Sequence, residues 1–305
     1  MSSTGIIDGL PIADYIRDVA PVPSLSASLA HILLSRSPQH AWMASARLNP
    51  AWEPDESEAR QDIGTIVHAI LLEGDRSRIV VIEADDYRSK LAKEARDLAH
   101  VQGKLPILAT RMVEADAAVE AARDQLVASE IADAFTGGHA ERTLIWTDAA
   151  GVTWRARPDW MDGDGLVLVD LKTTGGSAEP EAWSRGPLLA HGADLQAALA
   201  LRGMRALMGH AERSFIFVVL ETMPPYGLSL VGLDPQFMEF AETKLDAAAK
   251  TWAASLADGR WPGYPARVCW ASPPEYLVYR WGERRALEPE RPKIVDDGEG
   301  ETEEL

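Results

Sequence analysis

The chain has 305 residues, of which 46% are hydrophobic, and this is enough apolar material for a folded enzyme with a sizeable core. Its formal net charge is −17, and its single cysteine, Cys269, excludes an internal disulfide and any zinc or iron–sulfur site that needs several thiolates. The apolar runs are far shorter than the roughly 20 residues that cross a membrane, and the N-terminus lacks a secretory pattern. We therefore expect a cytoplasmic protein without a membrane span.

The helical signals are spread along the whole chain. Prolines interrupt residues 1–23, which we interpret as an N-terminal arm. The predicted helices that follow are one after the serines at 24–28, a mostly buried one over 63–73, two within 88–134, one over 193–208 and one over about 235–256.

The β signals lie in the second half. Runs at 144–146, 152–155 and 166–172 predict a meander of about three strands, and 214–220 predicts a further, strongly apolar strand. This order of elements favours one α/β domain over 24–284, with a mixed sheet and helical additions. Residues 285–305 are so acidic and polar that we expect a solvated tail.

Two carboxylates and a lysine fall on one predicted hairpin. Hydrolysis of a phosphodiester needs hard oxygen ligands for a divalent cation and a cationic group near the attacking water, which Asp159, Asp170 and Lys172 can supply. An Asp-x-Lys pair is often an ordinary surface pair on a strand. Here the apolar run 166–169 precedes Asp170 and indicates a buried strand. An unpaired acid on a buried strand is costly, so its presence indicates a functional role.

The hairpin geometry predicts that the two acids face each other. With a symmetric turn at 162–165, Met161 would pair with Leu166, and Asp159 would lie one diagonal step from Asp170 on the same face. Such neighbours are roughly 7–8 Å apart, close enough for one metal ion to be held between two carboxylates.

Four segments occur in an order typical of one nuclease family. They are 28–40 ending in Ser37-Pro38-Gln39-His40, 64–68 with Leu72-Glu73-Gly74, Arg157-Pro158-Asp159 with 170–174, and Gln196-Ala197-Ala198. With these segments the chain, over roughly 24–209, resembles the RecE-like branch of PD-(D/E)XK exonucleases of phage recombination systems (exodeoxyribonuclease VIII type). The resemblance implies the PD-(D/E)XK nuclease fold, a central mixed β-sheet flanked by helices, with N-terminal helical additions.

The resemblance also implies roles for individual residues. Asp159 and Asp170 would bind Mg²⁺, with Mn²⁺ as a substitute, and the carbonyl of Leu171 would contribute a further ligand. Lys172 would orient or activate the nucleophilic water, and His68 would be another metal ligand or a phosphate contact.

His68 and Gln196 also have more ordinary interpretations. A lone histidine on an apolar helix is commonly a hydrogen-bonded core residue, and a helical glutamine is commonly solvated. As a site residue, Gln196 would hydrogen-bond a metal-bound water or a phosphate. Related sequences tend to carry tyrosines around this glutamine, where the present chain has Ala193 and Ala200.

The function implied is that of a metal-dependent exonuclease that digests linear double-stranded DNA from 5′ to 3′ during phage-type homologous recombination. The resemblance further implies a homo-oligomer, a single-strand annealing protein as partner, and the bacterial host cytoplasm if a phage encodes the chain. Two alternatives stay open: an inactive DNA-binding or assembly protein with the nuclease fold, and a structure-selective endonuclease. The type that carries an iron–sulfur cluster is excluded by the single cysteine.

The net charge of the chain argues against DNA binding, because Lys and Arg usually supply phosphate affinity. A basic channel would require local clustering of cations. The basic residues near the site in sequence are Arg155, Arg157, Lys172, Arg185, Arg202 and Arg205.

Overall fold

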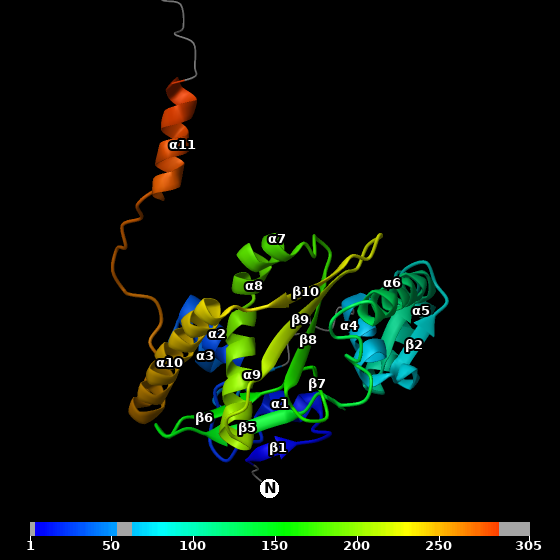
Figure 1. Cartoon of the computed structure of the whole chain (residues 1–305), viewed down its shortest axis with the longest axis horizontal. Helices are drawn as coiled ribbons and strands as arrows, with labels where there is room; N and C mark the ends of the chain where they lie inside the picture. The colour runs from blue at the N-terminus through cyan, green and yellow to red at the C-terminus, as the bar shows by residue number, and fades with distance from the viewer. Residues whose placement is uncertain (1–3, 54–62, 287–305) are drawn as a thin grey trace, which may run out of the picture. The chain divides into compact units, whose positions relative to one another are not determined.

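The computed structural model describes residues 4–53 and 63–286, which belong to two compact units, Met1–Gly263 and Tyr264–Leu305 (Figure 1). The first unit is α/β, as predicted. It includes the N-terminal residues interpreted as an arm, and it ends at Gly263, ahead of the domain end expected at 284. Most of the acidic tail expected at 285–305 lies outside the described residues.

A five-stranded mixed sheet is at the centre of the first unit. In spatial order its strands are β10 (Leu228–Gly232), β9 (Ser214–Glu221), β8 (Val167–Thr174), β7 (Trp160–Met161) and β4 (His139–Ala140). The neighbours β8 and β9 are parallel, and the other neighbours are antiparallel. The nearly continuous apolar sequence of β9 suits a strand that is covered on both faces.

The predicted three-stranded meander is wrong, because its strands belong to two sheets. In a separate sheet, β5 (Thr143–Thr147) lies between β6 (Thr153–Ala156) and the N-terminal strand β1 (Gly5–Ile7). The chain leaves β6 at Arg157-Pro158, where the proline has no N–H to continue the ladder, and then enters β7 in the central sheet.

Helices cover both faces of the central sheet, and alternate residues of its strands point to different cores. Leu168 and Phe217 pack in a core with α2 (Ala27–Ser35), α9 (Ala193–Met208) and α10 (Pro235–Asp258). Val169 and Val218 pack in a second core with the elements on the other side (Figure 1). These are α4 (Ile63–His68), the π-helix Ala69–Glu73 that continues it, and α6 (Ala109–Val127).

The remaining elements of this unit are short. They are α1 (Ile12–Arg17), α3 (Pro38–Ala44), a 3₁₀ turn (Arg76–Arg78), β2 (Ile79–Ile82), α5 (Lys90–Val101), β3 (Leu105–Leu108), α7 (Pro180–Arg185) and α8 (Pro187–Ala190). The two helices predicted within 88–134 are confirmed as α5 and α6, but β3 separates them and pairs in parallel with β2.

The second unit contains one helix within the described residues, α11 (Glu275–Ala286). Its side chains include exposed aromatic residues and several arginines. Across residues 4–53 and 63–286, no helix is both long enough and apolar enough to cross a bilayer.

A buried ion pair fastens residues 4–23, the N-terminal segment, to the core. Arg155 on β6 lies 3.2 Å from Asp18, and both side chains are buried. Arg155 also donates to the carbonyl and the hydroxyl of Ser24 at 2.8 Å, while Asp18 accepts from the Ser24 amide at 2.7 Å. Since each buried charge is paired and hydrogen-bonded, the network can persist without water.

We predict that Arg155→Met lowers the free energy of unfolding by about 3–5 kcal/mol, because it leaves the buried carboxylate of Asp18 without its cation. Urea unfolding followed by tryptophan fluorescence measures this change. Arg185→Met is the matched control: Arg185 forms an exposed pair with Glu181 one helical turn away, so its loss should cost about 0.5 kcal/mol or less. Equal effects of the two substitutions would contradict the anchoring role of Arg155.

Candidate active site

The hairpin that carries the acids has a different register from the one predicted. Met161 pairs with Leu168 and not with Leu166. Asp162 remains paired, since its amide donates to the carbonyl of Val167 at 3.0 Å. Its side chain also accepts from the amide of Leu166 at 2.7 Å, so the turn begins one residue later than expected.

The shift leaves Asp159 and Asp170 on one face because it amounts to an even number of residues. Trp160 pairs with Val169, so Asp159, one residue earlier, and Asp170, one residue later, lie opposite each other across the strands. A hydrogen bond of 2.7 Å from the amide of Leu171 to Oδ2 of Asp159 holds the two strands together at this point.

Asp170 is fully buried on the central strand, where both of its oxygens meet polar partners. Oδ1 accepts a hydrogen bond from Nε2 of Gln196 on α9, and Oδ2 forms an ion pair with the ammonium of Lys172. A carboxylate oxygen can accept more than one partner, so the buried Oδ2 retains acceptor capacity beside the ammonium. This carboxylate can therefore accept a further, cationic partner.

Lys172 completes a closed set of contacts with Asp170 and Gln196. Its ammonium donates to Oε1 of Gln196 at 2.9 Å. Burial alone lowers the pKa of Lys172, but the carboxylates of Asp170 and Asp159 outweigh burial and raise the pKa above its usual value. The lysine therefore stays protonated, which favours orienting a water molecule or stabilising charge over acting as a base.

His68 reaches the same place from the other face of the sheet. Its Nε2 donates to the carbonyl of Leu171 at 2.7 Å, and its Nδ1 lies 3.8 Å from Oδ2 of Asp159. The helix can come this close because Gly64 lies against Thr173 of β8, where a β-carbon would clash with the threonine hydroxyl. The structure thus brings together all six residues predicted for the site.

The environment of Asp159 disfavours the charged form of its carboxyl group. Burial, and then the neighbouring carboxylate of Asp170, raise its pKa to about 6, although His68, Lys172 and the amide of Leu171 act in the opposite direction. At neutral pH the charged form of Asp159 persists at a cost to folding stability. Perturbed acids of this kind cluster at functional sites.

A cavity of about 370 Å³ opens beside these residues, and Asp159, Lys172 and Gln196 line it. Its wall also includes Tyr15 and Arg157, neither of which was predicted as a site residue. Arg157 immediately precedes Pro158-Asp159 in the sequence, so its place was within reach of motif analysis. For Tyr15 the sequence offers no signal, because its nearness to the site depends on the folding of the N-terminal segment.

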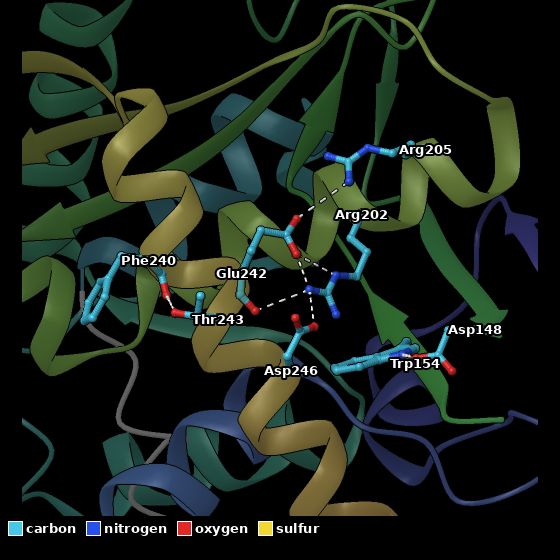
Figure 2. Close-up of polar contacts among 8 residues, drawn as sticks. All are labelled: Asp148, Trp154, Arg202, Arg205, Phe240, Glu242, Thr243 and Asp246. Carbon is cyan, nitrogen blue, oxygen red and sulfur yellow. Dashed lines mark hydrogen bonds and ion pairs between the residues drawn. The ribbon is translucent and has the colours of Figure 1, made fainter. Parts of the chain in front are cut away.

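The basic residues near the site in sequence do not gather around this cavity. Arg202 ion-pairs with Glu242 and, at 2.8 Å, with Asp246 on α10, while its guanidinium lies over the ring of Trp154 (Figure 2). Arg205 lies 3.9 Å from the same Glu242. These arginines join α9 to α10.

The other basic residues are also paired with acids. Arg185 pairs with Glu181, and Arg155 with Asp18. Of the six basic residues, Arg157 and Lys172 alone line the cavity. A broad basic channel built from this set is therefore absent from the described part of the chain.

The donors at the centre fit a hard divalent cation. Asp159 and Asp170 present carboxylate oxygens, and the carbonyl of Leu171 lies beside them. Within residues 4–53 and 63–286, no three His, Cys, Asp or Glu side chains are grouped as a metal site. His68 donates to the Leu171 carbonyl, so two of the predicted ligands contact each other. The fit therefore rests on two carboxylates, one main-chain oxygen and water.

We predict that Asp159→Asn stabilises the metal-free protein by about 1–3 kcal/mol at pH 7.5, because it removes a charge that folding disfavours. Since the folded pKa of about 6 exceeds the usual 3.8, the gain should shrink as pH falls through this range and vanish near pH 4. Urea unfolding in EDTA at several pH values measures the gain. Asp164→Asn, in the exposed turn of the same hairpin, should change the stability by about 0.5 kcal/mol or less. Destabilisation by Asp159→Asn at pH 7.5 would contradict the crowding of the two acids.

Comparison with solved structures agrees with this architecture. A candidate exonuclease from Eubacterium rectale is 12% identical, with 85% of the present chain and 93% of that chain covered and a TM-score of 0.52. At this identity the similarity concerns the fold alone. An alkaline exonuclease from Laribacter hongkongensis is 14% identical over 70% of this chain and 98% of its own, with a TM-score of 0.25, which is too low to support a comparison.

No curated protein matches the chain. A family model does match, over residues 30–270, and it is described as a PDDEXK-like domain of unknown function (DUF3799). The match covers most of the chain, including every residue predicted for the site, and confirms the predicted fold. The chain therefore belongs to the PDDEXK-like family DUF3799 and to the PD-(D/E)XK superfamily.

Proposed function

We propose that the chain is a metal-dependent DNA nuclease whose catalytic centre consists of Asp159, Asp170 and Lys172. The observation that carries this proposal is the closed contact among Asp170, Lys172 and Gln196, with Asp159 directly opposite, beside a cavity that Asp159, Lys172 and Gln196 line. A fold alone does not fix an activity. Two acids crowded together in a buried position oppose stability, however, and such an arrangement is typical of a catalytic centre.

The metal would be held by the carboxylates of Asp159 and Asp170 and by the carbonyl of Leu171, with His68 nearby. These donors suit Mg²⁺, with Mn²⁺ as a substitute. Bound there, the ion would polarise the scissile phosphate and lower the pKa of a bound water. His68 currently orients the Leu171 carbonyl, so its role is to position a ligand rather than to provide one.

Lys172 and Gln196 would prepare the site for the phosphate. The protonated Lys172 offers positive charge where negative charge develops in the transition state. Gln196 fixes this ammonium through its carbonyl oxygen and fixes Asp170 through its amide nitrogen. The glutamine is therefore a positioning residue for the two charged groups.

The substrate we propose is linear double-stranded DNA, digested from an end in the 5′ to 3′ direction. A cavity of about 370 Å³ has the size of a pocket for a small ligand, and a duplex does not fit into it. Separation of one strand before it reaches the centre would suit an enzyme that starts at ends. The direction, a homo-oligomeric assembly, an annealing protein as partner and a role in phage-type recombination in the host cytoplasm rest on the resemblance to RecE-like exonucleases.

We predict that the purified protein degrades linear duplex DNA with Mg²⁺ or Mn²⁺ and that EDTA stops the reaction. Asp170→Asn and Lys172→Met should each reduce the rate by about a hundredfold or more, because they remove a metal ligand and the stabilising cation. Gel analysis of end-labelled duplex measures the rates.

The matched control for this experiment is Lys250→Met, which removes an exposed lysine on α10 and should leave the rate unchanged. Circular dichroism checks that each variant is folded. Degradation at full rate in EDTA would exclude the metal mechanism. Absence of cleavage with either metal would favour the inactive DNA-binding alternative.

We also predict that a linear plasmid is digested and its covalently closed circle is spared, because one strand has to enter from an end. On linear duplex labelled at one terminus of one strand, the 5′ label should be released early and the 3′ label late. Rapid cutting of the closed circle would support the structure-selective endonuclease instead. Early release of the 3′ label would reverse the direction without affecting the assignment of the catalytic centre.

A further inference from the structure

One wall of the catalytic cavity comes from a part of the chain that the family match does not include. Helix α1 contributes Ile12 and Tyr15 to the lining, on the same cavity as Lys172 and Gln196. The family match begins only at residue 30. The N-terminal segment is therefore an addition to the matched domain that reaches the site.

The ring of Tyr15 is held in place by two buried arginines. The guanidinium of Arg155 lies 5.4 Å from the ring centroid, and that of Arg157 lies 5.8 Å from it. Both cations are fixed independently, because Arg155 pairs with Asp18 and Arg157 pairs with Glu141 at 2.6 Å. Contacts with two fixed guanidinium groups limit the movement of the ring at the cavity wall.

The hydroxyl of Tyr15 has no use in the fold itself. No hydrogen bond to it occurs within residues 4–53 and 63–286, and it is also not one of the fully buried unpaired polar atoms. Burial raises the pKa of Tyr15 even though the two arginines act to lower it, so the group stays a neutral O–H donor at working pH. Because Tyr15 lines the cavity, its side chain is available to a ligand there.

We propose that Tyr15 is a substrate contact of the nuclease site and that its hydroxyl donates a hydrogen bond to a phosphate oxygen of the strand that enters the cavity. This inference rests on the proposed function. It adds the N-terminal segment to the site and gives it a defined task.

The donors of the lining would suit a phosphate once a divalent cation offsets the carboxylates of Asp159 and Glu141, which also line the cavity. Tyr15 shares the cavity with the ammonium of Lys172 and the guanidinium of Arg157, which are also donors. A phosphodiester group offers only acceptor oxygens and carries the charge of the strand. Tyrosine hydroxyls are among the groups that bind DNA phosphates and fix the register of the strand. The contact would hold the backbone while the centre acts on it.

The test removes the hydroxyl and keeps the ring. Tyr15→Phe should lower kcat/KM on linear duplex DNA with Mg²⁺ by about tenfold or more, since a hydrogen bond to a charged group is lost. Tyr87→Phe is the matched control, because Tyr87 is also half-buried, with Arg96 stacked 5.4 Å from its ring centroid, but it does not line the cavity. Tyr87→Phe should cleave at the wild-type rate.

A second readout separates substrate contact from a structural role. Methylphosphonate groups, which are neutral, replace single phosphates near the end of the duplex in turn. Neutralising the contacted phosphate should lower kcat/KM of the wild type. For Tyr15→Phe the same replacement should lower kcat/KM by a factor about tenfold smaller, because the contact is already lost. Equal thermal unfolding of the two variants and the wild type shows that folding is intact.

The outcomes distinguish this inference from the proposed function. If the wild type cleaves DNA and Tyr15→Phe cleaves equally well, the inference is wrong and the nuclease assignment stands. If the wild type does not cleave, the affinity of each variant for fluorescein-labelled duplex in Ca²⁺ is measured instead. Weaker binding by Tyr15→Phe than by Tyr87→Phe then supports the contact without catalysis, and equal binding or none overturns it.

Discussion

The fold is organised around a carboxylate that has no contact with water. Asp170 lies on the central strand, and a buried charge of this kind persists only if other groups compensate it. Lys172, two residues along the same face, supplies the opposite charge, and Gln196 supplies a hydrogen bond from α9. Helix α9 is thus tied to the sheet at the point where the acid is buried. The packing of the core and the geometry of the site depend on the same contacts.

Compensation of buried charge also explains how this acidic chain uses its arginines. Arg155 fastens the N-terminal segment through its ion pair with Asp18, Arg157 pairs with Glu141, and Arg202 joins α9 to α10. Arginine suits these tasks because its planar guanidinium makes several directed bonds and also stacks on aromatic rings, as on Tyr15 and Trp154. Cations that appear from the sequence to be available for DNA are therefore committed to the structure.

Local patterns predicted much of this, and long-range contacts were where prediction failed. The helix over 193–208 and the shared face of Asp159 and Asp170 both follow from periodicity. The two acids stay on one face because the predicted and observed registers differ by an even number of residues. The register itself depended on side-chain bonds of Asp162. The separation of β5 and β6 from the central sheet depended on the break at Arg157-Pro158. The position of Tyr15 depended on an ion pair between residues far apart in the sequence.

The electrostatics of the site suggest how metal and DNA affinity are connected in the proposed enzyme. Asp159 and Asp170 face a single lysine, Lys172, and burial together with the neighbouring carboxylate of Asp170 raises the pKa of Asp159 to about 6. A divalent cation held by Asp159 and Asp170 would relieve their repulsion and would supply positive charge for a phosphate. By linkage, each ligand must then strengthen the binding of the other. On the proposed function, an acidic protein with few free cations at its cavity would bind DNA because the metal would supply the positive charge and the neutral hydroxyl of Tyr15 would add a hydrogen bond without adding charge.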